Sequence, residues 1–261
     1  MSQPAISQAV RELESNLGVR LFHRIGRSVS LTSAGEALLP LARQALRDLA
    51  LARIAASQTA DLATGRLDLA CLPTLAVGPL APIVGRFRVQ YPGLTITLSD
   101  PQDTAELLGF VRSGKCELGL VGTVDVVDLE TIPIGEQDFM VVLPPGSPVS
   151  DPMPLRELGA LPLVAPPRGS STRGVLDDVL EAWGGTSNVV VETAQREALL
   201  PLIAAGAGTG LLPRPLAGIA RMLGCVVVEP FPRVARPVAI VHRMAVLTPA
   251  AQAFIELARE G

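Results

Sequence analysis

Polar side chains suited to nucleic-acid contact lie near the start of the chain. Over residues 2–17, apolar residues recur every three or four positions and so form one stripe of a helix. They are Ile6, Val10, Leu13 and Leu17. The opposite face carries Gln3, Ser7, Gln8 and Arg11. These side chains can form hydrogen bonds with base edges or phosphates, so the helix is a candidate for contact with DNA.

An arginine-rich hairpin is predicted directly after this helix. Gly18 is typical of a helix end, and alternating apolar residues follow over 19–23 and 29–31. Three arginines crowd the hairpin, namely Arg20, Arg24 and Arg27. A polar-faced helix followed by a basic hairpin is typical of a winged helix that binds DNA. An amphipathic helix and a hairpin in an ordinary domain would fit the same residues.

A second group of polar side chains falls in loops that follow predicted strands. In chain order they are Thr74, Thr104, Thr123, Ser170, Ser171, Thr172, Arg173 and Thr193. In an open parallel sheet, ligands bind beyond the carboxyl ends of the strands, where loops meet helix N-termini. Residues 170–173 give the strongest signal, because hydroxyls beside the free N–H groups of a helix N-terminus can bind a carboxylate or another anion. Simple helix capping, which needs only one of these hydroxyls, is the alternative.

Other catalytic or metal-binding patterns are weak. The two histidines, His23 and His242, fall in different predicted domains, which argues against a histidine metal site or a Ser-His-Asp triad. The glycine-rich segment 206–210 follows a predicted helix and precedes a strand, the reverse of the order in nucleotide-binding loops. We therefore expect no catalytic residue, no metal and no cofactor.

A long helix is predicted from Thr32 to about Gln58. Ser33 and Glu36 have the spacing of a capping box, and Thr32 is an equally good cap. Small and aliphatic residues then alternate four and three apart, at Leu38, Ala42, Ala45, Leu49, Ala52 and Ala56. This heptad stripe suits two closely packed helices, with Pro40 bending the helix near its start. We expect a dimerisation helix; a helix packed on its own domain is the alternative.

Beyond a predicted hinge at 61–65, strands and helices alternate in two successive series. In the first, strands are predicted at 66–72, 94–98 and 117–121, with helices at 80–87 and 104–112 and a loop at Pro73–Thr74. In the second, strands are predicted at 139–143, 163–165, 189–192, 210–212 and 226–229, with helices at 172–183 and 194–205. A strand at 237–241 is expected to return to the first lobe before a terminal helix at 248–259. The first series predicts a parallel sheet covered by helices, and the second series repeats the pattern, so two α/β lobes are expected.

Composition and charge agree with this division. The chain has 261 residues, 48% hydrophobic residues and a mean hydropathy of +0.40, so it can bury one or two substantial cores. No apolar run reaches the roughly 18 residues that a membrane span needs. The first 60 residues carry seven arginines and four acidic residues, although the whole chain has a net charge of −3. A basic N-terminal part on an acidic body indicates that only the first part meets a polyanion.

The three cysteines are isolated from one another. Cys71, Cys116 and Cys225 stand in apolar surroundings, and their odd number leaves no complete set of disulfides. They are predicted to be buried thiols in a reducing cytoplasm.

A resemblance to a known family covers residues 2–35. The pattern SQPAIS-x-x-x-x-x-LE-x-x-LGVRLF-x-R-x-x-R-x-x-x-LT-x-AG resembles the DNA-binding signature of the LysR-type transcriptional regulators. The resemblance implies that Gln3, Pro4, Ser7, Gln8 and Arg11 lie on the recognition helix. It places Arg24 and Arg27 on or beside the wing, against phosphate or the minor groove. It also implies that Thr74 and Thr104 match positions that contact effectors, and that the long helix pairs subunits.

The chain departs from the family pattern at its start. In the family, two helices precede the stretch that matches SQPAIS, whereas here Met1 stands directly before it. An apolar stripe without partner helices forgoes roughly 1.5–3 kcal/mol per exposed side chain. We therefore expect the natural chain to be longer than the recorded one.

These observations predict an α/β protein with three parts. A partial winged helix-turn-helix spans residues 1–31, a linker and dimerisation helix spans 32–60, and an effector-binding domain that is similar to type 2 periplasmic binding proteins spans 65–261. In that domain, lobe I is expected at about 65–137 and 237–261, and lobe II at about 138–236.

The predicted function is that of a cytoplasmic, LysR-type, DNA-binding transcriptional regulator. Its expected partners are double-stranded promoter or operator DNA, a small-molecule effector that is a small anion or polar acid, and further copies of the chain in a homodimer or homotetramer, with no membrane. The alternative is a free-standing small-molecule-binding protein without DNA function, and an enzyme ranks third. A mobility shift with the DNA upstream of the gene would separate the first from the other two.

Overall fold

The structure is a computed structural model that describes residues 3–25, 28–56, 65–122, 126–183 and 187–260. The chain divides into two compact units. The smaller unit comprises residues 1–60 together with 112–115, and the larger unit comprises residues 61–111 and 116–261.

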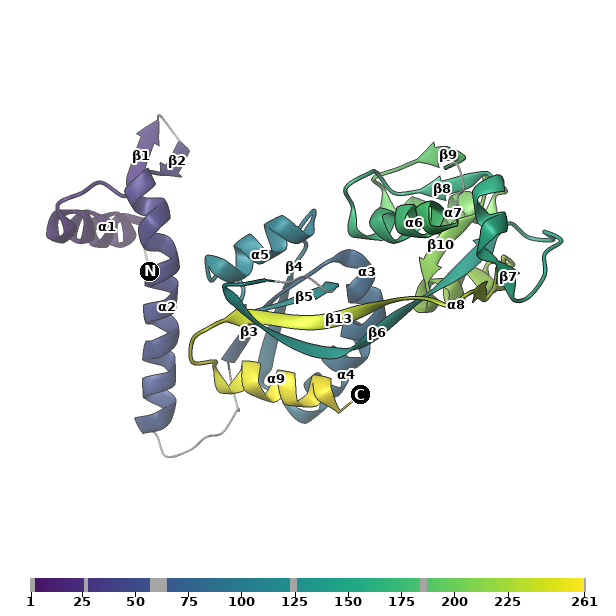
Figure 1. The fold of residues 1–261 in the computed structure, drawn as a ribbon. Coiled ribbons are helices and arrows are strands. Elements are labelled where there is room, and N and C mark those ends of the chain that lie inside the picture. Colours follow the sequence, from purple (N-terminus) through teal and green to yellow (C-terminus); the bar gives the residue numbers. More distant parts are fainter. Residues whose placement is uncertain (1–2, 26–27, 57–64, 123–125, 184–186, 261) are drawn as a thin grey trace. The chain divides into compact units, whose positions relative to one another are not determined.

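The smaller unit holds a helix, a hairpin and a long helix, in the order that the sequence predicts. Helix α1 spans Gln3–Leu17, strands β1 and β2 span Phe22–Ile25 and Ser28–Leu31, and helix α2 spans Ser33–Ala56. The two strands pair antiparallel, with Phe22 opposite Leu31. Figure 1 shows the hairpin at one end of α2.

Two polar side chains tie the hairpin to the helices beside it. The Glu14 carboxylate accepts hydrogen bonds from the backbone N–H groups of Leu21 and Phe22, at 2.7 and 3.2 Å. The Thr32 hydroxyl accepts from the Gly35 N–H at 3.1 Å and donates to the Arg20 carbonyl at 2.7 Å. Thr32 is therefore the residue that caps α2, and this single hydroxyl also anchors the segment between α1 and the hairpin.

Both helices of this unit present apolar side chains to solvent. On α1, Ile6, Leu13 and Leu17 are 44–50% exposed. On α2, Leu49 is 50% exposed, and Ala45 on the same predicted stripe is also exposed. Over its described part, the stripe along α2 is exposed at Ala42, Ala45 and Leu49, and this exposure is what a subunit-pairing helix requires.

The larger unit consists of two lobes. In lobe I, the strands are β3 (Gly65–Cys71), β4 (Leu94–Ser99) and β5 (Leu118–Gly122), and the helices are α3 (Pro73–Leu75), α4 (Ala81–Gln90), α5 (Thr104–Arg112) and α9 (Pro249–Arg259), with the π-helical segment η1 at Ala76–Leu80. Strand β3 pairs parallel with both β4 and β5. This is the β-α-β-α-β order predicted from the sequence, although Pro73 and Thr74 begin a short helix rather than a loop.

Lobe II repeats the α/β arrangement on a smaller scale. Its strands are β7 (Met153–Pro154), β8 (Leu163–Ala165), β9 (Val189–Glu192), β10 (Gly210–Pro213), β11 (Val226–Val228) and β12 (Pro230–Phe231). Its helical elements are η2 (Leu155–Ala160), α6 (Ser171–Ala182), η3 (Arg196–Ala198), α7 (Leu199–Ala204) and α8 (Arg214–Met222). The predicted helix at 194–205 is in fact the succession of η3 and α7, and α8 was not predicted. Its helical period is nevertheless present in the sequence, because Leu216, Ile219 and Ala220 recur three and four residues apart and Pro215 stands in the first turn, where proline is tolerated.

Two long strands join the lobes. Strand β6 spans Leu129–Leu143 and strand β13 spans Val234–Arg243, and they pair antiparallel over their shared length. Beyond Phe139, β6 pairs instead with β10 and β11 of lobe II. Figure 1 shows both strands running from lobe I into lobe II. The sequence predicted only the part of β6 after residue 138, because the preceding residues mix exposed polar and apolar side chains without a clear period.

Each lobe has its own aliphatic core. Alternate residues of β6 divide between the two faces of the lobe II sheet, with Phe139 and Val141 on one face and Met140 and Val142 on the other. In lobe I, the backbone of β5 lies so close to its covering helix that a Cβ at Gly119 would meet Leu107 at 2.7 Å. The two lobes are therefore separately packed bodies that share two strands.

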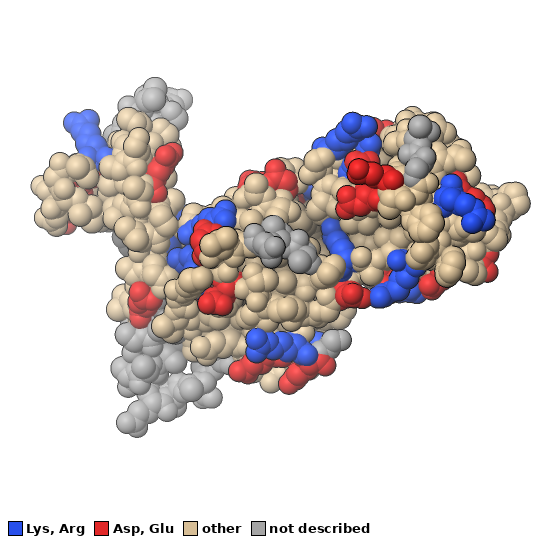
Figure 2. All heavy atoms as spheres, in the orientation of Figure 1, with Lys and Arg blue, Asp and Glu red and all other residues tan. Residues whose placement is uncertain are grey.

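Basic and acidic side chains are interspersed on the surface of the larger unit. On the face drawn in Figure 2, basic and acidic side chains of this unit lie beside one another rather than in separate patches. None of the helices over the described residues has the length and apolar character to cross a membrane.

We expect Thr248→Ala to destabilise lobe I. The Thr248 hydroxyl caps α9 by accepting from the Ala251 N–H at 3.2 Å, and it donates at 2.9 Å to Glu117, a carboxylate that is only 7% exposed. Losing both bonds should lower the free energy of unfolding by about 1–3 kcal/mol, as measured by denaturant titration. Thr248→Ser keeps the hydroxyl and serves as the control. An unfolding midpoint for Thr248→Ala equal to that of the wild type would contradict this account.

Candidate functional site

A cavity of about 210 Å³ lies between elements of the two lobes of the larger unit. Lobe I contributes Leu72, Pro73, Thr74, Val77 and Gln102. Lobe II contributes Pro166, the first residues of α6 with their cap (Ser170, Ser171 and Thr172), Arg196 and Glu197 of η3, and three leucines. This position beyond the ends of parallel strands is where α/β sheets bind ligands.

The cavity has an apolar body and a polar end. Leu199, Leu212 and Leu216 from lobe II and Leu72 and Val77 from lobe I form the apolar part of the lining. The hydroxyls of Thr74, Ser171 and Thr172 mark the polar part. An apolar lining with a few convergent polar groups is the usual composition of a small-molecule site.

Arg236 holds the polar end together. It lies on β13, and its guanidinium donates to the Ser171 hydroxyl of lobe II and to the Thr74 hydroxyl of lobe I, both at 2.8 Å. The Thr172 hydroxyl lies 3.3 Å from that of Thr74. One arginine on a shared strand therefore contacts both lobes at the polar end of the cavity.

Gln137 fixes the position of this arginine. Gln137 and Arg236 are directly opposite each other in the β6–β13 ladder. The Gln137 amide oxygen accepts from Arg236 at 3.0 and 2.7 Å, and its amide nitrogen donates to the Thr74 carbonyl at 2.7 Å. The Gln137 amide packs so tightly against η1 that a Cβ at Gly78 would lie 2.5 Å from it. Gln137 is 3% exposed, so all of its bonds are made within the protein.

Burial affects the charge of Arg236. Desolvation lowers the pKa of Arg236 to about 10, which leaves the guanidinium charged at neutral pH. The ring of Phe139 lies beneath it, with 5.4 Å between the guanidinium carbon and the ring centroid. Arg236 makes no ion pair with any carboxylate in the described part of the chain. Its hydrogen-bond acceptors are neutral oxygens.

Arg173, a predicted site residue, lies elsewhere. Its side chain is 2% exposed, and it donates to Asp177 at 2.7 Å, to Glu192 at 3.1 Å and to the Pro166 carbonyl. Burial by itself lowers the pKa of Arg173, but hydrogen bonds to the two carboxylates outweigh it and raise the pKa above its ordinary value. Arg173 does not line the cavity and ties α6 to β9 instead. Its place in the sequence beside three hydroxyls could not reveal this, because one helical position rotates a side chain by about 100°.

Of the other residues predicted for the effector site, some line the cavity and others do not. Ser170 lines the cavity and caps α6, accepting from the Arg173 N–H at 3.4 Å and donating to the Pro167 carbonyl at 2.8 Å. Thr104 begins α5, and the Thr193 hydroxyl accepts from the Gln195 N–H at 3.0 Å. Neither of these two threonines lines the cavity. Thr123 lies outside the described residues.

The predicted DNA-contacting residues lie on α1 and the hairpin. Pro4, Gln8 and Arg11 are exposed on α1, and Ser7 on the same helix is partly exposed. The Gln8 amide donates to Glu12 one turn later, at 3.1 Å. The side chains of Gln3 and Arg24, and all of Arg27, lie outside what the structure describes.

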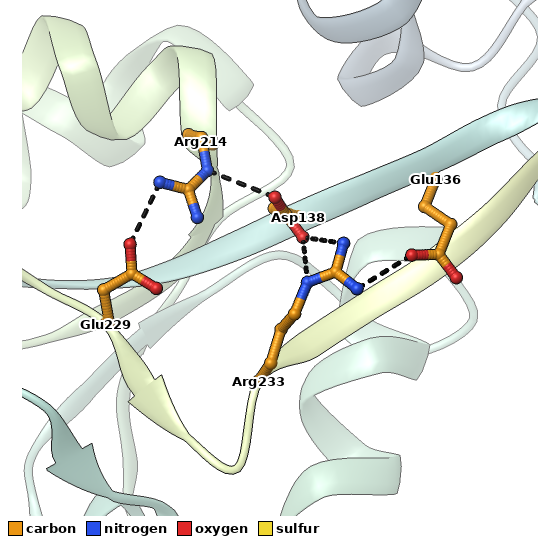
Figure 3. Close-up of polar contacts among 5 residues, drawn as sticks. All are labelled: Glu136, Asp138, Arg214, Glu229 and Arg233. Carbon is orange, nitrogen blue, oxygen red and sulfur yellow. Dashed lines mark hydrogen bonds and ion pairs between the residues drawn. The ribbon is translucent and has the colours of Figure 1, made fainter.

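A second group of charged residues lies beside β6 and the start of β13. Arg233 contacts Glu136 at 2.9 Å and Asp138 at 2.6 Å, and Arg214 contacts Asp138 at 3.2 Å and Glu229 at 3.1 Å. Figure 3 shows that Asp138 bridges the two arginines. These arginines have carboxylate partners, in contrast to Arg236.

Cys71, Cys116 and Cys225 are buried, and none of them is in a disulfide. Burial raises the pKa of the Cys71 thiol to about 12, and it also raises the pKa of the Cys225 thiol. Because the thiolate is the reactive form of cysteine, these two thiols are poor nucleophiles at neutral pH. The predicted buried thiols are therefore confirmed.

Sequence patterns contain no local signal for Gln137 and Arg236. Arg236 lies 162 positions from Thr74 and 65 from Ser171, and both distances exceed any sequence pattern of helices or strands. The predicted return strand also began one residue too late to include Arg236. Only the pairing of β6 with β13 brings these two side chains to the cavity.

Comparisons with known proteins identify the family. Residues 1–36 match the bacterial regulatory helix-turn-helix of the lysR family, and residues 60–261 match the LysR substrate binding domain. A probable hydrogen peroxide-inducible genes activator of Mycobacterium leprae is 30% identical over 221 residues, which cover 83% of this chain and 71% of that protein. A protein of the same description from Mycobacterium xenopi is 36% identical over 151 residues, or 58% of this chain and 79% of that protein.

Solved structures of LysR-family regulators are also similar to this chain. A cysteine mutant of OxyR from Corynebacterium glutamicum is 26% identical, with a TM-score of 0.68 over 100% of this chain and 83% of that one. A full-length OxyR variant of Pseudomonas aeruginosa is 24% identical and shares the fold, with a TM-score of 0.79 over 100% of this chain and 85% of that one. The winged-helix elements, the two-lobed domain and both family matches lead to one conclusion: the chain belongs to the LysR family of DNA-binding transcriptional regulators.

Proposed function

We propose that the cavity between the two lobes binds the small-molecule effector of this LysR-type regulator. The observation that carries the proposal is that Arg236 joins Thr74 of lobe I to Ser171 of lobe II at the polar end of the cavity. A ligand in this place contacts both lobes, so its binding free energy depends on their arrangement. Such a ligand shifts the population toward the arrangement that it binds more tightly.

We also propose that three segments of the chain have different functions. Residues 1–31 contact DNA through Gln3, Pro4, Ser7, Gln8 and Arg11, with Arg24 and Arg27 against the phosphates. Residues 32–60 pair subunits in a homodimer or homotetramer, and residues 65–261 bind the effector. The exposed apolar stripe of α2 supports the pairing. CbnR, which shares the fold at 23% identity, has been solved in complex with its target DNA. A DNA-bound regulator of this kind acts in the cytoplasm and has no need of catalytic activity.

Peroxide sensing, which the names of the relatives raise, is not part of this proposal. Sensing by a cysteine needs an accessible thiolate. Here all three cysteines are buried, and none lines the cavity. The raised pKa of Cys71 opposes thiolate formation further. We therefore favour a ligand that binds non-covalently.

We expect Val77→Trp to block the cavity. Val77 lines it and is 43% exposed, so an indole can enter the space without displacing the core. Compounds from a small-molecule library that raise the Tm of the wild type should bind this variant at least about tenfold more weakly in calorimetry, a loss of about 1.4 kcal/mol. Val89→Trp, at an 85% exposed position on α4, is the control. Unchanged affinity in Val77→Trp would place the effector elsewhere.

We expect two substitutions in the first unit to affect DNA binding differently. Arg27→Ala should weaken binding to all sequences alike and reduce the slope of log affinity against log salt by about one, because it removes one phosphate contact. Gln8→Ala should instead change the preference among base sequences by about 1–3 kcal/mol. Both are measured by fluorescence anisotropy on DNA from upstream of the gene. A loss confined to one base position in Arg27→Ala would make Arg27 a direct reader of sequence.

A further inference from the structure

We propose that a second cavity is the entrance to the first, and that an ion pair between Arg196 and Asp100 is the latch that closes this entrance. The inference deepens the proposed function and rests on it, since it concerns access to the same cavity. It involves none of the hydroxyls at the polar end of that cavity.

The second cavity, called the outer cavity below, has a volume of about 270 Å³ and adjoins the first. Four residues line both cavities, namely Gln102 of lobe I and Pro166, Ser170 and Arg196 of lobe II. These residues therefore form a wall between the two spaces, and both lobes contribute to this wall.

The outer cavity faces solvent, whereas leucines of the first cavity are buried. Asp103, Arg168, Gly169 and Ala194 line only the outer cavity, and all four are exposed. Leu212, which lines the first cavity, is 2% exposed. A small molecule that reaches this leucine through the outer cavity must therefore pass the shared wall.

The wall carries an ion pair that joins the lobes. Arg196 begins η3 of lobe II, and one of its guanidinium nitrogens lies 3.4 Å from each carboxylate oxygen of Asp100, which follows β4 of lobe I. In contrast, the ion pairs of Arg173, Arg214 and Arg233 lie within lobe II or beside the shared strands. Because its partners belong to different lobes, the latch breaks when the lobes move apart.

Local hydrogen bonds fix the two segments that carry the latch. The Thr193 hydroxyl accepts from the Gln195 N–H at 3.0 Å, directly before the arginine of the latch. The Gln102 N–H donates to the Glu106 carboxylate at 2.7 Å, in the turn that follows the aspartate of the latch. Both charged side chains therefore extend from ordered turns, and the contact between them is the part that can open.

The latch is weak enough to open readily. The side chains of Arg196 and Asp100 are 36% and 63% exposed, and water and salt screen ion pairs that are this exposed. Such a pair changes an opening equilibrium by about two- to fivefold. The latch therefore slows the entry and exit of a ligand without preventing either.

The test measures access to the first cavity with a neutral thiol reagent, N-ethylmaleimide, on the whole protein. Leu212→Cys places a thiol at a buried position of this cavity, and mass spectrometry follows the rate of its modification at neutral pH. In this background, Asp100→Asn and Arg196→Gln should each raise the rate about two- to fivefold, because each breaks the latch.

Charge reversal and salt make the test specific for the ion pair. The double variant Asp100→Asn with Arg196→Gln should be no faster than either single variant, because both remove one interaction. Asp100→Arg combined with Arg196→Asp should restore the slow rate. Raising NaCl to about 1 M should accelerate the modification when the latch is intact and leave it unchanged in Asp100→Asn.

Ala194→Trp tests the entrance itself. Ala194 is exposed and lines only the outer cavity, so an indole at this position narrows the entrance without filling the first cavity. It should slow the modification of Leu212→Cys several-fold. If Leu212→Cys has a strongly lowered Tm, Leu199→Cys gives the same measurement, because Leu199 also lines the first cavity and is 6% exposed.

Two controls separate the latch from general loosening. Arg233→Gln removes an exposed ion pair with Glu136 and Asp138, none of which lines either cavity, and it should leave the rate unchanged (Figure 3). The native Cys116 is 1% exposed in the core of lobe I, so its own modification reports loosening of that lobe. If a latch variant accelerates Cys116 equally, the salt dependence with the latch intact decides instead.

The failure of the latch and the failure of the proposed function give different results. A rate for Leu212→Cys that is the same with and without the latch, and independent of salt, would overturn the latch. An unchanged rate in Ala194→Trp would place the entrance elsewhere and overturn the role of the outer cavity. Neither result affects the proposed function, which depends on whether Val77→Trp blocks the binding of compounds.

Discussion

The antiparallel pairing of β6 with β13 is the constraint on which the larger unit depends. These two strands pass from lobe I into lobe II, and their ladder sets Gln137 directly opposite Arg236. The register is interrupted between Val238 and Ala239, where Gly135 adopts a φ of +129° that favours glycine. A one-residue slip in this ladder would turn every side chain to the other face, and the cavity would lose its arginine.

The alternation of side chains along β6 separates two kinds of polar contact. Glu136 and Asp138 point to one face and pair with Arg233 and Arg214 in an exposed network (Figure 3). Gln137 and Phe139 point to the other face, where the amide and the ring enclose the guanidinium of Arg236. Carboxylates are thus kept on the outer face of this strand. On the inner face, Arg236 contacts the Thr74 and Ser171 hydroxyls that line the cavity, and its acceptors are neutral oxygens.

This arrangement connects ligand binding to the geometry of the lobes. Ser171 begins the first helix after the β8 loop in lobe II, and Thr74 follows the first strand of lobe I, so their separation depends on how the lobes sit on the shared strands. Arg236 contacts both at 2.8 Å. A ligand that accepts hydrogen bonds from these hydroxyls has an affinity that depends on the same separation, which is the requirement for a ligand-driven change of state.

Local patterns in the sequence determined individual helices and their caps. The apolar period of α1, the hydroxyl of Thr32 at the start of α2 and that of Ser170 at the start of α6 each act within a few residues, and all three are found as predicted or within the alternatives considered. The family signature of residues 2–35 likewise lies in one continuous stretch. Short-range spacing suffices to locate these features because helix periods, caps and hairpin turns involve residues within a few positions of one another.

Tertiary structure alone decided which polar side chains meet. Arg173 stands beside three hydroxyls in the sequence, yet its position on α6 directs it to Asp177 and Glu192. Arg236 has no such neighbours in the sequence, yet strand pairing brings it to Thr74, 162 positions away. Such contacts depend on the register of β6 and β13 and on the packing of whole lobes, and no local period of 2 or 3.6 residues encodes them.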